Sequence, residues 1–146
     1  MHPHLLHEIG LIRTLHKVIE HEAPLCPFKL EFSAKGADMI EYWDLDTKRH
    51  IFRIVQELLN NARKHSQASN VSITITSLSN QILLIYRDDG IGFPSHPIEH
   101  SEIGSSGTGI EQMKNRILSL EGKWEIRTDT GSGVYLTVTI PMRKVA

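Results

Sequence analysis

Several side chains suited to chemistry fall on one face of a single expected helix. They follow one another at spacings of three or four residues, which aligns them along that face: Arg53, Glu57, Asn61 and either Lys64 or His65. A carboxamide oxygen such as that of Asn61 can bind Mg²⁺ beside phosphates, because Mg²⁺ takes few protein ligands and keeps several waters. A solvated face with an Arg53–Glu57 ion pair explains the same pattern, so the helix alone leaves both interpretations open.

A second candidate is a short acidic and glycine-rich run at the end of an expected strand, Asp88-Asp89-Gly90-Ile91-Gly92. Asp-Gly pairs are common in ordinary turns. Alternatively, the glycines let the backbone approach a flat ligand closely, because they carry no side chain. The neighbouring carboxylate can then accept a hydrogen bond from an exocyclic amine such as that of adenine. Taken alone, the run does not decide between these interpretations.

A third candidate is the glycine-rich run from Gly104 to Gly109, which leads into an expected helix. The start of a helix offers free N–H groups and the positive end of the helix dipole, and both favour phosphate. The run is not a Walker loop, because no Lys-Ser or Lys-Thr pair follows the glycines. The dinucleotide fingerprint also fails, since the run does not join a strand tightly to the helix. For a lone loop, a flexible linker is the simpler interpretation.

The bulk composition bounds the class of protein. The chain has 146 residues, 40% of them apolar and 23% charged, which fits one soluble domain with one core. A net charge of −1 favours neither nucleic acid nor an anionic membrane as a partner, so phosphate binding must come from a local site. With a single cysteine, Cys26, no disulfide can form within the chain, which favours a reducing compartment. The longest apolar stretch, residues 82–86, is too short to span a bilayer.

The hydrophobic periodicity predicts the elements that must position the three candidate groups. Helices are expected at residues 5–22, 46–65 and 109–120, and strands at 28–32, 71–75, 82–87, 124–127 and 134–140. Asp46 or Thr47 is expected to cap the second helix. This order predicts an α/β two-layer sandwich, with a mixed, mostly antiparallel sheet of about five strands covered on one face by three helices.

Taken together, the three candidates resemble the Bergerat fold of the GHKL ATPases. That superfamily includes type II topoisomerase ATPase domains, mismatch-repair proteins, heat-shock chaperones and histidine kinases. Residues 53–65, Arg-Ile-Val-Gln-Glu-Leu-Leu-Asn-Asn-Ala-Arg-Lys-His, resemble the N box of bacterial sensor histidine kinases that pair with helix-turn-helix (NarL-type) response regulators. Residues 107–116, Gly-Thr-Gly-Ile-Glu-Gln-Met-Lys-Asn-Arg, resemble the second glycine box of that subfamily. The resemblance covers nearly the whole chain and implies the Bergerat fold.

The resemblance implies a role for each matching residue. Asn61 corresponds to the asparagine that chelates Mg²⁺, and Glu57 to the acid that orients or activates the phosphoryl acceptor. Asp88 corresponds to the aspartate that hydrogen-bonds the adenine amine. Gly90 and Gly92 correspond to glycines that let the backbone lie close to the nucleotide.

Further positions are implied around the phosphates of bound ATP. Gly107 and Gly109 match lid glycines, with Thr108 between them, and the lid itself spans about residues 93–107. Lys64 and His65 are expected on the phosphate side. Two other residues are either further nucleotide contacts or structural, Arg116 and Thr137. Residues 1–24 are expected to follow a dimerisation region, and residues 25–146 to form the ATP-binding catalytic domain.

The activity implied is transfer of the γ-phosphoryl group of ATP to a histidine on a separate dimerisation domain, for relay to a response regulator. None of the nine histidines of the chain matches the phosphoacceptor motif, so we expect that histidine upstream. The fragment is then a monomer, the full-length protein a homodimer, and nucleic acid is not a partner. The domain is expected in the cytoplasm, with the full-length protein either soluble or anchored in the bacterial membrane.

Some positions depart from the family pattern. Asp89 stands where asparagine is common, Glu121-Gly122 replaces a frequent Gly-Gly, and Val134 stands where threonine is frequent, so no nucleotide contact is expected from Val134. Two alternatives keep the fold: a serine kinase of the anti-sigma-factor type, and a degenerate interaction module that binds no nucleotide. Residues 3–15 resemble the stretch that follows the dimerisation helices of the histidine kinases. This stretch and the Met-Lys-Asn-Arg segment favour the histidine kinase over the first alternative, and the intact motifs argue against the second.

Overall fold

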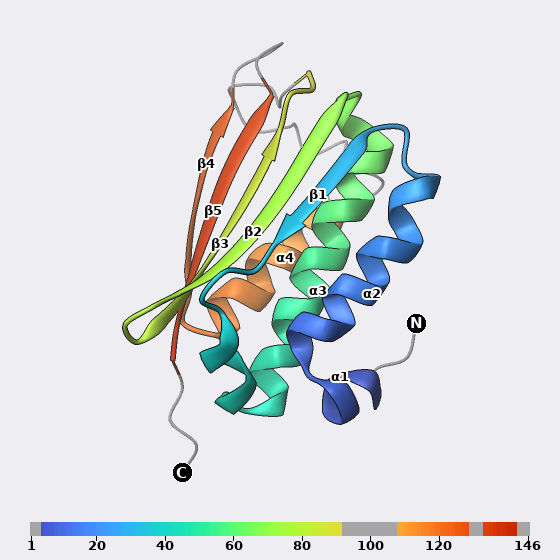
Figure 1. Cartoon of the computed structure of the whole chain (residues 1–146). Coiled ribbons are helices and arrows are strands. Elements are labelled where there is room, and N and C mark those ends of the chain that lie inside the picture. Colours follow the sequence, from blue (N-terminus) through green and yellow to red (C-terminus); the bar gives the residue numbers. More distant parts are fainter. Residues whose placement is uncertain (1–3, 92–107, 129–132, 143–146) are drawn as a thin grey trace.

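The structure, a computed structural model, describes the backbone of residues 4–91, 108–128 and 133–142. Within these ranges a five-stranded sheet has the order β1-β2-β3-β5-β4, and helices cover one of its faces (Figure 1). The strands are β1 Lys29–Ser33, β2 Asn70–Leu78, β3 Gln81–Asp88, β4 Lys123–Thr128 and β5 Val134–Pro141. The pair β1–β2 is parallel, and the pairs β2–β3, β3–β5 and β4–β5 are antiparallel. The predicted mixed, mostly antiparallel α/β sandwich is therefore confirmed.

The helical layer forms as the periodicity predicts, with differences at the helix ends. Its members are α1 His4–Ile9, α2 Leu11–Glu22, η1 Ala23–Leu25, η2 Asp38–Tyr42, α3 Leu45–Asn61, η3 Ala62–Ser66 and α4 Thr108–Ser119. None of these helices has the length and apolar character needed to cross a membrane, in the part of the chain described.

Helix α3 is the central element of this layer, and it begins earlier than predicted. Asp44, not Asp46 or Thr47, is its N-cap: Asp44 accepts hydrogen bonds from the Thr47 backbone N–H at 3.0 Å and from the Thr47 hydroxyl at 2.7 Å. The apolar stripe of α3, which includes Ile51 and Val55, is buried in the core. The helix continues into η3, a π-helical turn that ends at Gln67 in the left-handed region, with φ of 50°.

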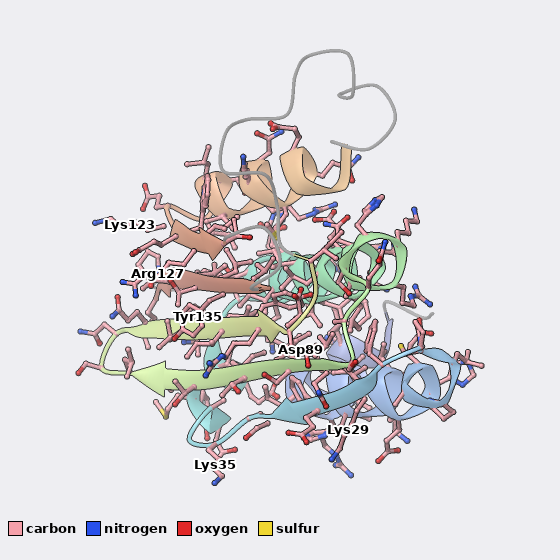
Figure 2. All side chains as sticks on the ribbon, turned by 90° about the horizontal axis from the view of Figure 1, so that it is seen from above. Lys29, Lys35, Asp89, Lys123, Arg127 and Tyr135 are labelled. Atoms are coloured by element: carbon pink, nitrogen blue, oxygen red, sulfur yellow. The ribbon has the colours of Figure 1, made fainter. Side chains whose placement is uncertain are left out.

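The core lies between the sheet and the helices. On β2, β3 and β5 every second side chain is buried, as expected when one face of a sheet packs and the other does not. The opposite face carries polar and charged side chains, and Lys123, Arg127 and Tyr135 point away from the helices (Figure 2). Tyr135 lies beside Arg87 of β3, whose guanidinium is 5.1 Å from the ring centroid.

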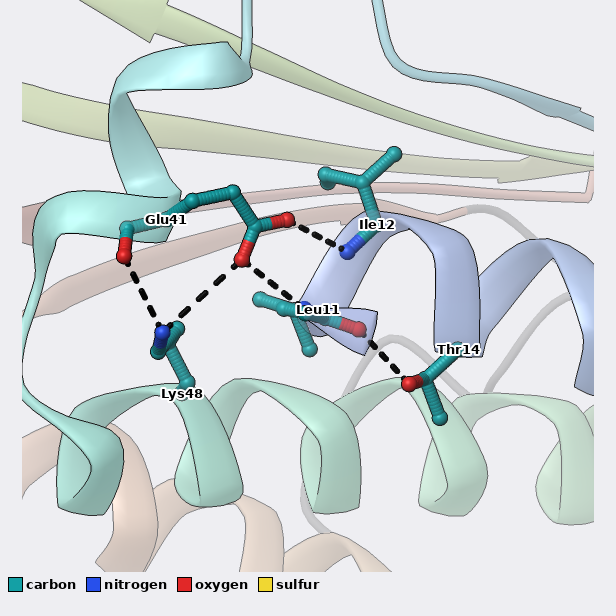
Figure 3. A network of polar contacts seen from close by, with 6 residues as sticks. Leu11, Ile12, Thr14, Glu41 and Lys48 are labelled. Atoms are coloured by element: carbon teal, nitrogen blue, oxygen red, sulfur yellow. Dashed lines mark hydrogen bonds and ion pairs between the residues drawn. The ribbon is translucent and has the colours of Figure 1, made fainter. Parts of the chain in front are cut away.

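The single helix predicted over residues 5–22 is broken at Gly10. Gly10 has φ of 91°, and a Cβ there would lie 2.7 Å from a carboxylate oxygen of Glu41. That carboxylate accepts hydrogen bonds from the backbone N–H groups of Leu11, at 2.9 Å, and Ile12, at 3.0 Å, so it caps the start of α2 (Figure 3). The Lys48 ammonium, on α3, donates to the Glu41 carbonyl at 3.1 Å and lies 3.8 Å from its carboxylate.

Removal of this cap should destabilise the domain. We expect Glu41→Ala to lower the free energy of unfolding by about 1–2 kcal/mol, because two N–H groups of α2 lose their acceptor. Glu125→Ala is the matched control: the Glu125 side chain is 68% exposed and pairs with Arg127 at 3.5 Å, so its loss should cost less than about 0.5 kcal/mol. Urea denaturation of both variants measures the difference, and equal costs would contradict the capping role.

Candidate functional site

A cleft opens at one end of the sheet, between the carboxyl end of α3 with η3 and the strands β3, β4 and β5, with α4 alongside. The space between its walls, counting the open solvent at its mouth, is about 480 Å³. Its walls are largely apolar, from Leu58, Met113, Ile126 and Leu136. Such a cleft suits a flat aromatic ligand that one or two polar groups hold in place.

Asp88, at the end of β3, is the acidic group of this cleft. Its Oδ1 accepts hydrogen bonds from the backbone N–H groups of Gly90, at 3.0 Å, and Val134, at 3.2 Å. Its Oδ2 accepts a hydrogen bond from the Tyr86 hydroxyl at 2.5 Å. These three donors thus fix the Asp88 carboxylate. Its oxygens can still accept a further hydrogen bond from a ligand.

The sequence interpretation missed Tyr86. This residue is two positions before Asp88 on the same strand, so both side chains point to the same face of the sheet. Tyr86 is 4% exposed and lines the cleft. Burial, together with the hydrogen bond to Asp88, raises the pKa of the Tyr86 hydroxyl far above its ordinary value. The hydroxyl therefore stays protonated and serves as a permanent donor to Asp88.

Two glycines bring the backbone against Asp88. A Cβ on Gly90 would overlap the Ser66 carbonyl oxygen of η3, to which the Ile91 backbone N–H donates at 2.9 Å. A Cβ on Gly133, which has φ of 83°, would overlap the Asp88 carbonyl oxygen. Gly90 therefore joins β3 to the π-helical turn, and Gly133 lets β5 begin beside Asp88.

Asp89 points away from the cleft and has a structural role. Its Oδ1 accepts from the backbone N–H groups of Ser69, at 2.8 Å, and Asn70, at 2.9 Å, and its Oδ2 accepts from the Asn70 side chain at 2.8 Å. These bonds, first of all those from Asn70, lower the pKa of Asp89. An acceptor-only carboxylate fits three donors, so aspartate at this position, where asparagine is common, is compatible with the fold.

The other predicted nucleotide residues separate into two groups. Asn61 and His65 line the same cleft as Asp88, whereas the exposed Lys64 is not among its lining residues. Thr108 begins α4, and Gly109 follows in its first turn. Gly92, Gly107 and the predicted lid, residues 93–107, lie outside the described residues. The cleft thus brings together Asn61 and His65 of the first motif and Asp88 of the second.

Glu57 does not line the cleft. It borders a groove on the outer side of α3, between α2 and α4, and the Arg116 Nε donates to Glu57 Oε1 at 3.3 Å. Its other oxygen, Oε2, is buried and has no hydrogen-bond partner among the described residues. Burial raises the pKa of Glu57 above 4.5, while the hydrogen bond and charge of Arg116 and the charge of Arg53 oppose the rise. Folding thus favours the protonated form of Glu57. The stability that this form contributes is fully present below the unfolded pKa of 4.5 and is lost as the pH rises through the higher pKa of the folded chain.

Arg116 and Thr137, which are either further nucleotide contacts or structural, do not line the cleft. Arg116 is engaged with Glu57 and lies outside the cleft lining. Thr137 of β5 lies on the uncovered face of the sheet, beside Glu125 and Arg127, because it alternates with the cleft residue Leu136. The position of Thr137 therefore favours the structural alternative over a nucleotide contact. Val134, from which no contact was expected, lines the cleft and donates its backbone N–H to Asp88.

Comparison with known proteins gives the family. The profile of the "Histidine kinase-, DNA gyrase B-, and HSP90-like ATPase" family matches residues 46–144. The chain is 34% identical over 142 residues to the sensor histidine kinase ComP of Bacillus subtilis, covering 97% of this chain and 18% of ComP. It is 32% identical over 141 residues to the histidine-protein kinase/phosphatase DegS of Brevibacillus brevis, covering 94% of this chain and 34% of DegS.

A likeness in fold extends to solved structures. The histidine kinase domain of a blue-light activated histidine kinase from Erythrobacter litoralis superposes with a TM-score of 0.69 at 21% identity, over 91% of this chain and 59% of that chain. The resemblance seen in the motifs is thus confirmed, although the chain spans only 18% and 34% of the two curated relatives above. The chain belongs to the histidine kinase-, DNA gyrase B- and HSP90-like ATPase family.

Proposed function

We propose that this chain is the ATP-binding catalytic domain of a sensor histidine kinase. It transfers the γ-phosphoryl group of ATP to a histidine on a separate dimerisation domain, for relay to a response regulator of the NarL type. The observation that carries the proposal is the Asp88 carboxylate, fixed by three donors in an apolar cleft that also contains Asn61. We further propose that the domain acts in the cytoplasm and that the full-length protein dimerises through helices upstream.

The adenine end of the site lies at Asp88. A carboxylate only accepts hydrogen bonds, and Tyr86 and the two backbone N–H groups leave it with acceptor capacity toward the cleft. The exocyclic amine of adenine is a donor that matches this acceptor. Guanine presents a carbonyl oxygen at the corresponding position, which the carboxylate repels. The apolar side chains of Leu58 and Met113 offer contact to the faces of a planar base.

The phosphate end lies toward Asn61, with His65, Lys64 and the start of α4 at Thr108. The described residues contain no group of three His, Cys, Asp or Glu side chains that could hold a metal. The carboxamide oxygen of Asn61, together with the phosphates of ATP and water, would suit Mg²⁺, which takes few protein ligands. Bound there, Mg²⁺ supplies neutralisation of the phosphate charge.

The transfer step needs positioning more than covalent help from the protein. A ring nitrogen of the phosphoacceptor histidine forms a bond to the γ-phosphorus while the bond from that phosphorus to the bridging oxygen breaks, and ADP leaves. The proton on the other ring nitrogen passes to Glu57, whose pKa burial raises toward that of an effective base. Glu57 lies one helical turn from Asn61 and outside the cleft, which suits a group that serves the acceptor and not the nucleotide.

Substitution of Asp88 should weaken ATP binding more than removal of its hydroxyl partner. We expect Asp88→Asn to weaken binding of a non-hydrolysable ATP analogue by about ten- to a hundredfold, because an amide donor faces other donors. Tyr86→Phe should weaken it by about two- to tenfold, since it removes one orienting hydrogen bond. Titration calorimetry measures both affinities, with circular dichroism as the control for folding. Binding of the wild-type strength by a folded Asp88→Asn variant would contradict the proposal.

The role of Asn61 predicts a loss of metal dependence. The unaltered chain should bind the ATP analogue more tightly with Mg²⁺ than with a chelator present, and Asn61→Ala should reduce this difference to within about twofold. Asn60→Ala is the matched control, because Asn60 is the preceding residue, is exposed and accepts a hydrogen bond from Arg63 at 2.6 Å. Asn60→Ala should keep the full Mg²⁺ dependence of analogue binding. If Asn61→Ala keeps it as well, Asn61 does not bind the metal.

A further inference from the structure

Glu57 and Arg116 join two helices across the outer groove. They lie 59 residues apart in the sequence, on α3 and α4, and the Arg116 Nε donates to Glu57 Oε1 at 3.3 Å. The Nη1 of Arg116 lies 3.4 Å from Nδ1 of His50, two turns before Glu57 on α3. His50 Nε2 in turn lies 3.8 Å from an oxygen of Asp46. The guanidinium of Arg116 is therefore held between two side chains of α3.

The carboxylate of Glu57 depends on this partner. The Glu57 side chain is 13% exposed and that of Arg116 is 30% exposed, so water solvates the acid poorly. A buried carboxylate without a hydrogen-bonding cation loses its charge by taking up a proton. Since Oε2 has no partner among the described residues, the stabilisation of the ionised form rests on what reaches Oε1.

We propose that Arg116 is a positioning residue for phosphoryl transfer, which holds Glu57 as an oriented carboxylate in the groove between α2, α3 and α4. The inference rests on the proposed function of the domain, and it gives Arg116 a role toward the acceptor and not toward the nucleotide. A protonated Glu57 cannot take the histidine proton, so the ion pair keeps the base competent.

Other charges around Glu57 are less well placed for this role. Arg53, one turn earlier on α3, is exposed, and its guanidinium donates to Gln56 at 3.0 Å. On the α2 side of the groove, Glu22 is paired with Arg63 at 3.3 Å. On the α4 side, Arg116 is the charged residue that lines the groove, with the neutral Gln112 beside it. Arg116 is therefore the substitution that should change the protonation of Glu57 most.

The test follows the side-chain carboxyl carbon resonance of Glu57 by NMR as the pH is varied, with Glu57→Gln to assign the signal. Arg116→Gln should raise the pKa of Glu57 above that of the unaltered chain, because the opposing hydrogen bond and charge are gone. Arg116→Lys should restore part of the difference, since lysine keeps the charge but not the planar donor geometry. Arg53→Gln is the matched control, with a smaller rise expected.

The affinity for the ATP analogue separates this role from nucleotide binding. Because Arg116 lies outside the cleft lining, its substitution should leave that affinity unchanged within about twofold. An unchanged pKa of Glu57 in Arg116→Gln would overturn the inference, and so would a tenfold or greater loss of analogue affinity, roughly the loss of one binding contact. If the unaltered chain binds no ATP analogue, the proposed function fails, whereas the titration of Glu57 still decides whether Arg116 controls that acid.

Discussion

The arrangement of the site depends on one interaction, the hydrogen bonding of the half-buried Asp88 carboxylate. Three donors converge on it: the Tyr86 hydroxyl from within β3, the Gly90 N–H just beyond its end and the Val134 N–H from the start of β5. The bond from Val134 ties the start of β5 to the end of β3. The approach of these segments leaves no room for a Cβ at Gly90 or Gly133. The same contacts that shape the end of the sheet thus orient the acid that we assign to adenine.

Helix α3 presents its candidate site residues to two separate places, the cleft and the outer groove. Its carboxyl end, with η3, contributes Asn61 and His65 to the cleft, while Glu57, one turn earlier, faces the outer groove with Arg116. The buried stripe of the helix holds both sets of groups in a fixed relation, because Ile51, Val55 and Leu58 pack against the core. A kinase needs such a division, since nucleotide and acceptor must meet from different sides at the phosphate.

The sequence was most informative where local periodicity decides the structure. The strands and the buried stripes of α3 and α4 follow the alternation and spacing of apolar residues, and the motif residues Asn61, His65 and Asp88 meet in one cleft as expected. Long-range contacts were not predictable in this way. The break at Gly10 depends on Glu41, some 30 residues away, and Arg116 finds Glu57 only because α4 packs beside α3. The Tyr86 hydroxyl was in principle visible, because residues two apart on a strand share a face.

The central claim is that this domain phosphorylates a histidine from ATP bound at Asp88. The most direct measurement is incubation of the full-length protein with γ-labelled ATP and Mg²⁺, followed by tests of the acid and base stability of the product. The account predicts a phosphoryl group that is stable to base and labile to acid, as a phosphohistidine is, and that is lost when Asp88 is replaced by asparagine. An acid-stable phosphoserine would contradict it, and so would labelling of undiminished extent in the folded Asp88→Asn protein at a limiting ATP concentration.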